Sequence, residues 1–165
     1  MASSLMQRTG RSLGIFSNDF AVRGLARLTN AAWIEGSPSW DEESMQRAAS
    51  QLLEQLDTTD HLYVHMTVTT SAPVERQCAM DRLDQLLIKP LSQRLAQHSG
   101  RLAVILDDRA SSTSAVIAMG EGIDPQPAVS LSVEALAESP LQFHDANALA
   151  EWFLPKGTAS PISAA

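Results

Sequence analysis

Two adjacent carboxylates, Asp107 and Asp108, directly follow a short apolar run at Leu102–Leu106. The run predicts a buried strand, and open α/β sheets bind their ligands at the carboxyl ends of such strands. Carboxylate oxygens are ligands for divalent cations. An aspartate that caps a turn at the end of a strand is the commoner use of the same pattern. The sequence therefore offers a metal site at these two residues and, as its structural alternative, a capped turn.

The remaining reactive side chains have simpler structural interpretations. His65 lies inside an apolar run, which favours a hydrogen-bonded core histidine over a ligand. His144 and Asp145 stand where the last helix is expected to begin, which is typical of an N-cap and its neighbour. Cys78 falls in a helical pattern and is expected to be a partly buried thiol without catalytic partners. His61 and His98 are expected at the surface, and the Ser/Thr-rich loop at 111–114 lacks the glycines of a phosphate-binding loop.

Helices and strands alternate along the chain. Apolar periodicity predicts helices over 18–28, 41–56, 73–99 and 145–153, the first capped by Asn18 or Asp19, the second by Asp41 and the third interrupted at Pro90. Short apolar or alternating runs predict strands at 31–34, 62–68, 102–106 and 128–133. Crossovers of this length favour an α/β fold with a mostly parallel sheet and helices on both faces. The strands 62–68 and 102–106 are expected to be parallel, buried neighbours, with 62–68 central in the sheet.

The core of this fold is expected to consist of aliphatic side chains from the helices and the two buried strands. Seven of them are predicted to be almost inaccessible to solvent: Leu52, Leu56, Val64, Leu83, Leu87, Val104 and Leu106.

Length and composition limit the function classes. A chain of 165 residues suits one domain, which we expect over 13–155 between a flexible N-terminus (1–12) and a loose tail (156–165). The net charge of −7, with 12 scattered basic residues, argues against a nucleic-acid partner. No apolar run reaches the roughly 20 residues of a membrane span, so no membrane association is expected. One cysteine excludes an internal disulfide and favours a cytoplasmic location.

Several segments of the sequence resemble segments of a known protein family. They are SLGIFSNDFAVRGLARLT (12–29), TTDHLYVHMTV (58–68), MDRLDQLLIKPL (80–91) and QFHDANALAEWFL (142–154). In wording and order, the chain from about Leu13 to Pro155 resembles the C-terminal part of the archaeal-type cofactor-independent phosphoglycerate mutases. These are metalloenzymes of the alkaline phosphatase superfamily. The resemblance implies an alkaline-phosphatase-like partial domain, because the N-terminal metal-binding strand, the nucleophile and the inserted domain of the family have no counterpart here.

The same resemblance identifies which metal ligands are missing. The family holds two ions, Mn²⁺, Zn²⁺ or Mg²⁺, in a cage of Asp and His residues. Its Asp-Glu-Ala-Gly-His phrase corresponds here to Thr69–Val74, and its Asp-His-Ser-Thr-Pro phrase to Asp107-Asp108-Arg109-Ala110-Ser111. A third histidine phrase corresponds to Gly122–Pro127. The resemblance thus implies that Asp107 and Asp108 are vestigial metal ligands. Either Asp108 or Arg109, depending on register, stands where the family has its histidine, and Arg109 there would oppose a cation. Neither a catalytic residue nor a bound cofactor is predicted.

These observations lead to one leading hypothesis and two alternatives. The chain is expected to be a degenerate, non-catalytic relative of the phosphoglycerate mutases, a pseudoenzyme acting as a scaffold or interaction domain with a protein partner or as a homo-oligomer. The first alternative is an enzyme: one piece of a split or oligomeric metal-dependent phosphomutase or phosphatase. The second is a decaying reading frame with no selected role.

Overall fold

The computed structural model describes residues 10–70, 72–98, 100–106, 114–123 and 143–153. The chain divides into two compact units, Met1–Arg94 and Leu95–Ala165. Each unit has its own sheet, and the two are described one at a time.

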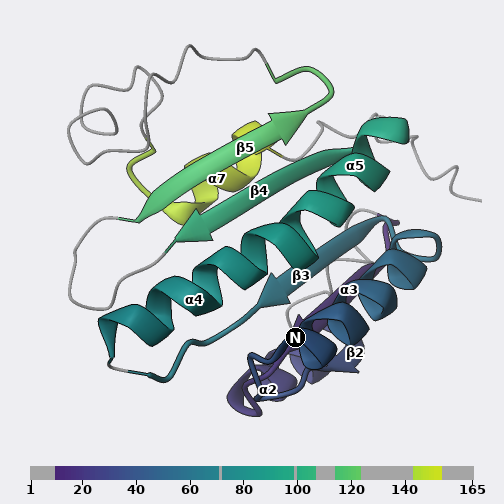
Figure 1. The fold of residues 1–165 in the computed structure, drawn as a ribbon. Helices are drawn as coiled ribbons and strands as arrows, with labels where there is room; N and C mark the ends of the chain where they lie inside the picture. Colours follow the sequence, from purple (N-terminus) through teal and green to yellow (C-terminus); the bar gives the residue numbers. More distant parts are fainter. Residues whose placement is uncertain (1–9, 71, 99, 107–113, 124–142, 154–165) are drawn as a thin grey trace, which may run out of the picture. The chain divides into compact units, whose positions relative to one another are not determined.

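A three-stranded parallel sheet organises the first unit (Figure 1). Its strands are β1 (Leu13–Ser17), β2 (Ala32–Glu35) and β3 (His61–His65), in the order β2-β1-β3. β1 is therefore central, and its residues from 14 to 17 are all buried. β3 was predicted to be central and covered on both faces, but it lies at an edge of this sheet, and Tyr63 is exposed. Within this sheet the prediction is wrong, because β1 pairs with both β2 and β3 and therefore takes the central position.

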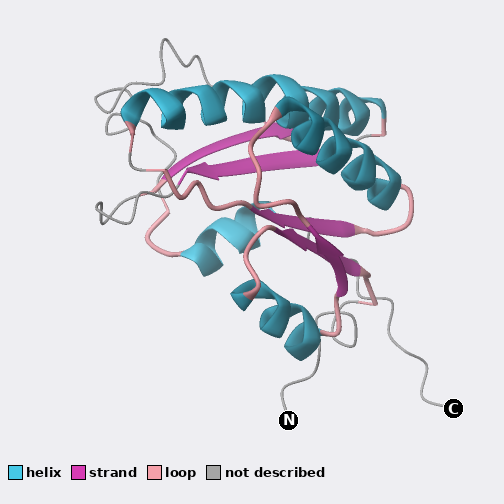
Figure 2. Cartoon of the chain, turned by 60° about the horizontal axis from the view of Figure 1, so that its bottom comes forward, coloured by secondary structure: helices cyan, strands magenta, loops and turns pink. Residues whose placement is uncertain are grey.

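Two helices cover opposite faces of this sheet (Figure 1, Figure 2). α2 (Ala21–Thr29) contacts β1 and β2 and buries Ala26. α3 (Glu42–Leu56) packs on the other face, where Phe16 points, since successive residues of a strand alternate between faces. Asp41 caps α3 as predicted, because its carboxylate accepts a 2.7 Å hydrogen bond from the Ser44 N–H. Asp19 accepts from Ala21 N–H at 2.9 Å and so holds the first turn of α2.

The third helical segment is continuous but contains one wide turn. α4 (Pro73–Leu83) runs into a π-helical turn, η1 (Asp84–Ile88), and then into α5 (Lys89–Gln97). Pro90 has no N–H to donate to the preceding turn, and π turns are one way in which a helix accommodates such a loss. The π turn ends at Ile88, just before the interruption that the sequence predicts at Pro90.

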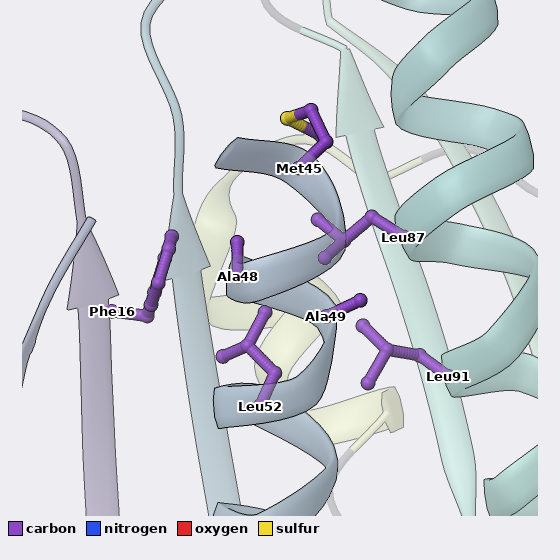
Figure 3. Close-up of a cluster of buried hydrophobic side chains, with 7 residues drawn as sticks. All are labelled: Phe16, Met45, Ala48, Ala49, Leu52, Leu87 and Leu91. Atoms are coloured by element: carbon purple, nitrogen blue, oxygen red, sulfur yellow. The ribbon is translucent and has the colours of Figure 1, made fainter. Parts of the chain in front are cut away.

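The buried core of the first unit lies between β1, α3 and the η1–α5 segment (Figure 3). Seven side chains form it: Phe16, Met45, Ala48, Ala49, Leu52, Leu87 and Leu91. Leu52 and Leu87 are buried as predicted. Leu56, Val64 and Leu83 are only partly buried and pack around this cluster.

The described residues of the second unit include an antiparallel hairpin and the helix α7. β4 (Arg101–Leu106) pairs with β5 (Ala115–Gly120), and α7 spans Ala146–Phe153. Arg101 joins these parts, donating to the Glu121 carbonyl at 2.7 Å and to the Phe153 carbonyl at 2.8 Å. Val104 is partly exposed rather than fully buried. The Leu106 side chain and the strand predicted at 128–133 lie outside the described residues.

The predicted parallel pairing of 62–68 with 102–106 joins the two units and stays a prediction. Within its own unit, β4 pairs antiparallel with β5 over its whole length, from Arg101 opposite Gly120 to Leu106 opposite Ala115. β3 pairs with β1 within the first unit. The run at Ala115–Gly120 follows β4 after a short connection, and a short connection favours an antiparallel partner because parallel pairing needs a long crossover.

Candidate functional site at the carboxyl edge of the parallel sheet

The carboxyl edge of the parallel sheet collects polar side chains from all three strands. Ser17, Glu35 and His65 end their strands and lie in register across the sheet, with Ser17 in the middle. The two crossovers lead from β1 to β2 and from β2 across to β3, so the strand order reverses between β1 and β3. Open α/β sheets bind ligands at such a switch point. Ser17 and His65 occupy it here.

Ser17 is the buried polar side chain of this edge, with 1% of its surface exposed. Its Oγ lies 3.0 Å from Nδ1 of His65 and accepts a 2.9 Å hydrogen bond from the Asp19 N–H. The hydroxyl hydrogen is satisfied when it is donated to Nδ1, an arrangement in which the imidazole carries its own hydrogen on Nε2. His65 is thus the hydrogen-bonded histidine that the sequence predicts. Its partner Ser17 has almost no access to solvent, which does not suit a nucleophile.

A second pair of hydrogen bonds ties the segments that follow β1 and β3. The Asn18 side chain donates to the Thr67 carbonyl at 3.2 Å and accepts from the Thr67 N–H at 2.9 Å. Beyond β2, the Gly36 N–H donates to the Ser17 carbonyl at 2.8 Å. A Cβ atom at Gly36 would lie 2.8 Å from the Phe16 ring, so this close approach requires glycine. The polar groups at the switch point therefore hold the three strand ends together.

The loop after β3, where the family resemblance places metal ligands, has a local structural role. The Thr70 hydroxyl accepts from the Ala72 N–H at 3.2 Å and hydrogen-bonds the Glu75 carboxylate at the start of α4. Hydroxyl groups do not replace carboxylate and imidazole ligands for a divalent ion. Across the ranges that the structure describes, no group of three or more His, Cys, Asp or Glu side chains could hold a metal. The described residues therefore do not fit the two-metal cage of the family.

The structure describes four of the other candidate residues, Asp145, Cys78, His98 and His61. Asp107 and Asp108 lie outside the described residues. Asp145 accepts from the Ala148 N–H at 2.8 Å and thus caps α7 as predicted. Cys78 is exposed, so its prediction as a partly buried thiol is wrong: it lies on the outward side of α4. His98 is exposed as predicted, whereas His61 is partly buried.

A shallow hollow lies beside the carboxyl end of β2. Its lining includes Glu35, Ser37, Ser44, Arg47 and Gln51. The Arg47 guanidinium, which would be its natural anion-binding group, is paired with Glu43 at 2.8 Å. The hollow is wide open, and it lacks the enclosed apolar lining of a small-molecule pocket.

The electrostatic features of the sheet lie at its amino edge. The Ser12 N–H and hydroxyl donate to the Asp60 carboxylate at 2.7 and 2.8 Å and hold its pKa below the usual value. Burial lowers the pKa of the neighbouring His61, the Arg11 guanidinium lowers it further, and Asp60 partly opposes both. This edge is remote from the switch point, so these shifts concern stability rather than a reaction.

We expect the Asp60→Asn variant to lose less stability than the parent chain when the pH falls. Asp60 has a lower pKa in the folded chain than the unfolded value of about 3.9, so its contribution is present above that pH and disappears as the pH falls through the folded-state pKa. Asparagine keeps an acceptor for Ser12 but does not titrate. The effect is at most about 1 kcal/mol because the pair is exposed. Urea unfolding between about pH 5 and pH 2 measures it, with Asp81→Asn as the control. Identical pH profiles for Asp60→Asn and the parent chain would contradict the assignment.

Searches against protein-family models, curated proteins and solved structures find no match. In the part of the chain that the structure describes, every helix is too short or too polar to cross a membrane.

Proposed function

We propose that this chain is a degenerate, non-catalytic relative of the cofactor-independent phosphoglycerate mutases that acts as a scaffold or interaction domain. One observation carries the proposal: the loop between β3 and α4 uses the Thr70 hydroxyl for local hydrogen bonds to the Ala72 N–H and the Glu75 carboxylate. In that loop the resemblance requires an aspartate and a histidine, and the chain has Thr69, Thr70 and Ala72.

The switch point of the sheet supports the same conclusion. Ser17 and His65 are engaged with each other, and Asn18 is engaged with the Thr67 backbone. Groups that could bind a ligand are thereby used to hold β1 and β3 together. A buried hydroxyl with complete hydrogen bonding stabilises a fold and is not poised to attack a substrate.

The enzymatic alternative is a piece of a split or oligomeric phosphomutase or phosphatase. Another polypeptide could supply an N-terminal strand and a nucleophile. It would also have to replace ligands in a loop that this chain already provides and closes by hydrogen bonds. This second requirement makes the alternative the weaker one.

We expect Mn²⁺ or Zn²⁺ at millimolar concentration to raise the unfolding temperature by less than about 1 °C. A site with micromolar affinity would contribute about 4 kcal/mol under these conditions. For a chain of this size that corresponds to a rise on the order of 10 °C, which is too large to overlook. Differential scanning calorimetry of the purified chain, with and without metal, gives the answer.

The variants for this experiment separate a residual site from nonspecific metal binding. Asp107→Ala with Asp108→Ala tests the vestigial ligands, and Asp81→Ala on α4 is the control. A metal-dependent rise that is lost only in the double variant would overturn the proposal. Turnover of 3-phosphoglycerate or p-nitrophenyl phosphate by the purified chain would overturn it more directly.

A further inference from the structure

α2 carries an apolar face that is not used within the first unit. Phe20, Leu25 and Leu28 are exposed over 66%, 46% and 84% of their surface. The helix contacts the sheet with its opposite side, where Ala26 is 1% exposed. α2 therefore has two apolar strips. One packs on the sheet, and the other faces solvent.

Helix geometry arranges the outward residues in rows. Residues four apart lie one above the other, so Phe20, Gly24 and Leu28 form a central row; Phe20, the N-cap residue, has helical dihedral angles. Ala21 and Leu25 form the row on one side. Arg23 and Arg27 form the row on the other side.

Gly24 makes a notch in the middle of this face. Its φ is not positive, and a Cβ atom placed on it would meet nothing within 4 Å. Neither a turn nor close packing inside the chain therefore explains a glycine that costs the helix about 1 kcal/mol relative to alanine. A notch between two large apolar side chains is the shape that receives a ridge of another helix.

The charge beside the notch is positive. Arg23 and Arg27 are exposed, and neither forms an ion pair or a side-chain hydrogen bond with a described residue. α2 contains no acidic residue, although the whole chain has a net charge of −7. The two guanidinium groups are thus a local basic row beside an apolar surface.

We infer that the outward face of α2 is the docking surface for an α-helix of a partner protein whose apolar side is flanked by carboxylates. The apolar residues of that helix pack over Gly24, between Phe20 and Leu28. Its Asp or Glu side chains meet Arg23 and Arg27. This inference rests on the proposed role as an interaction domain and names the class of partner.

Charge favours this partner over two other occupants of the same face, a second copy of the chain and an anionic membrane. A second copy docked face to face with the helices antiparallel would bring the Arg23–Arg27 rows of both copies to the same side, where they repel each other. With the helices parallel, each arginine row would face the apolar Ala21–Leu25 row of the other copy and meet no carboxylate. An anionic membrane would attract the two arginines but repel a chain of net charge −7. A helix with acidic flanks complements both the apolar row and the basic row.

The test uses two designed peptides and the full chain. Both are stapled amphipathic helices of about 18 residues with the same leucine face, one flanked by Glu and the other by Lys. Fluorescence anisotropy measures their binding. We expect the Glu-flanked peptide to bind at least about tenfold more tightly than the Lys-flanked one, and Arg23→Glu with Arg27→Glu to reverse that preference.

A further variant tests the role of the notch at Gly24. Gly24→Leu fills it, and since a side chain there meets no neighbour, the chain keeps its fold and α2 gains helix propensity. We expect this variant to bind the Glu-flanked peptide about tenfold more weakly while unfolding at no lower temperature. Ser50→Leu, which adds the same side chain to an exposed position of α3, is the matched control and should bind normally.

Three results would overturn the inference. The first is absent or equal binding of the two peptides, and the second is binding that Leu28→Glu leaves unchanged. The third is self-association or binding to phosphatidylserine vesicles that Leu28→Glu abolishes while the Glu-flanked peptide does not bind. If the metal and turnover experiments remain negative at the same time, only the docking surface is rejected and the non-catalytic role stands.

Discussion

Phe16→Ala is expected to lower the free energy of unfolding of the first unit by about 3–5 kcal/mol, the range for removing a buried aromatic ring. Phe16 is 0% exposed and lies on the central strand β1. Its ring is part of the cluster with Met45, Ala48 and Leu52 of α3 (Figure 3). The loss includes both the transfer of the ring from water and the cavity that remains, because neighbouring strands restrict collapse around it.

Tryptophan fluorescence during urea unfolding measures this effect. Trp33 and Trp40 report on the first unit, and Trp152→Phe removes the signal from α7 in both parent and variant. Leu28→Ala is the control, because an apolar side chain that is 84% exposed contributes within about 0.5 kcal/mol. A loss below about 1 kcal/mol for Phe16→Ala would show that β1 does not pack against α3 as described.

Gly120→Ala is expected to destabilise the β4–β5 hairpin by about 1–3 kcal/mol. Gly120 has φ +125°, a region that residues with a Cβ atom rarely adopt. An added Cβ would overlap the Gly100 carbonyl oxygen and lie 2.7 Å from Cα of Arg101. Both obstacles belong to the backbone, so a side-chain rotation does not relieve them.

Hydrogen exchange resolves this change because it reports on each segment separately. Amides of β4 and β5 should exchange faster in Gly120→Ala, while those of α3 keep their protection. Gly24→Ala is the matched control: its Cβ meets no neighbour, and alanine should stabilise α2 by about 0.5–1 kcal/mol. Unchanged protection of β4 and β5 would contradict the positive-φ assignment at Gly120.

The helices could be predicted from sequence because their signals are local. Met45, Ala48, Ala49 and Leu52 recur at helical spacing behind the cap Asp41, and the structure buries all four. The cap and the apolar face of α3 lie within one segment, so no distant partner is needed to specify them.

The strands were predicted less well because an apolar run does not specify which other strand it pairs with. A parallel partner at 62–68 was predicted for the run Leu102–Leu106, and its antiparallel partner Ala115–Gly120 was not. No strand was predicted at β5, although its apolar residues were a usable signal. Hydrophobic periodicity did not identify β1, although its residues lie in the segment 12–29 that carries the family resemblance.

The site could be predicted only in part. His65 was singled out as a hydrogen-bonded histidine, but its partner Ser17 on β1 was not. Asn18 was considered only as a helix cap, whereas its side chain hydrogen-bonds the Thr67 backbone. Their signal is a Ser-Asn-Asp phrase directly after the apolar residues of β1, which is a common end of a strand.

The sequence by itself determined the helices, the caps of α3 and α7, the mixed α/β class and the absence of carboxylate and imidazole ligands from the loop after β3. Those properties depend on residues that are neighbours along the chain. Only the tertiary structure decided that β1 is central, that Ser17 meets His65 across 48 positions, and that α2 presents a second apolar strip to solvent. The physical reason is that strand pairing, register and exposure depend on contacts between distant segments. Several apolar runs of similar composition could pair with any one strand, so the sequence of that strand does not specify its partner.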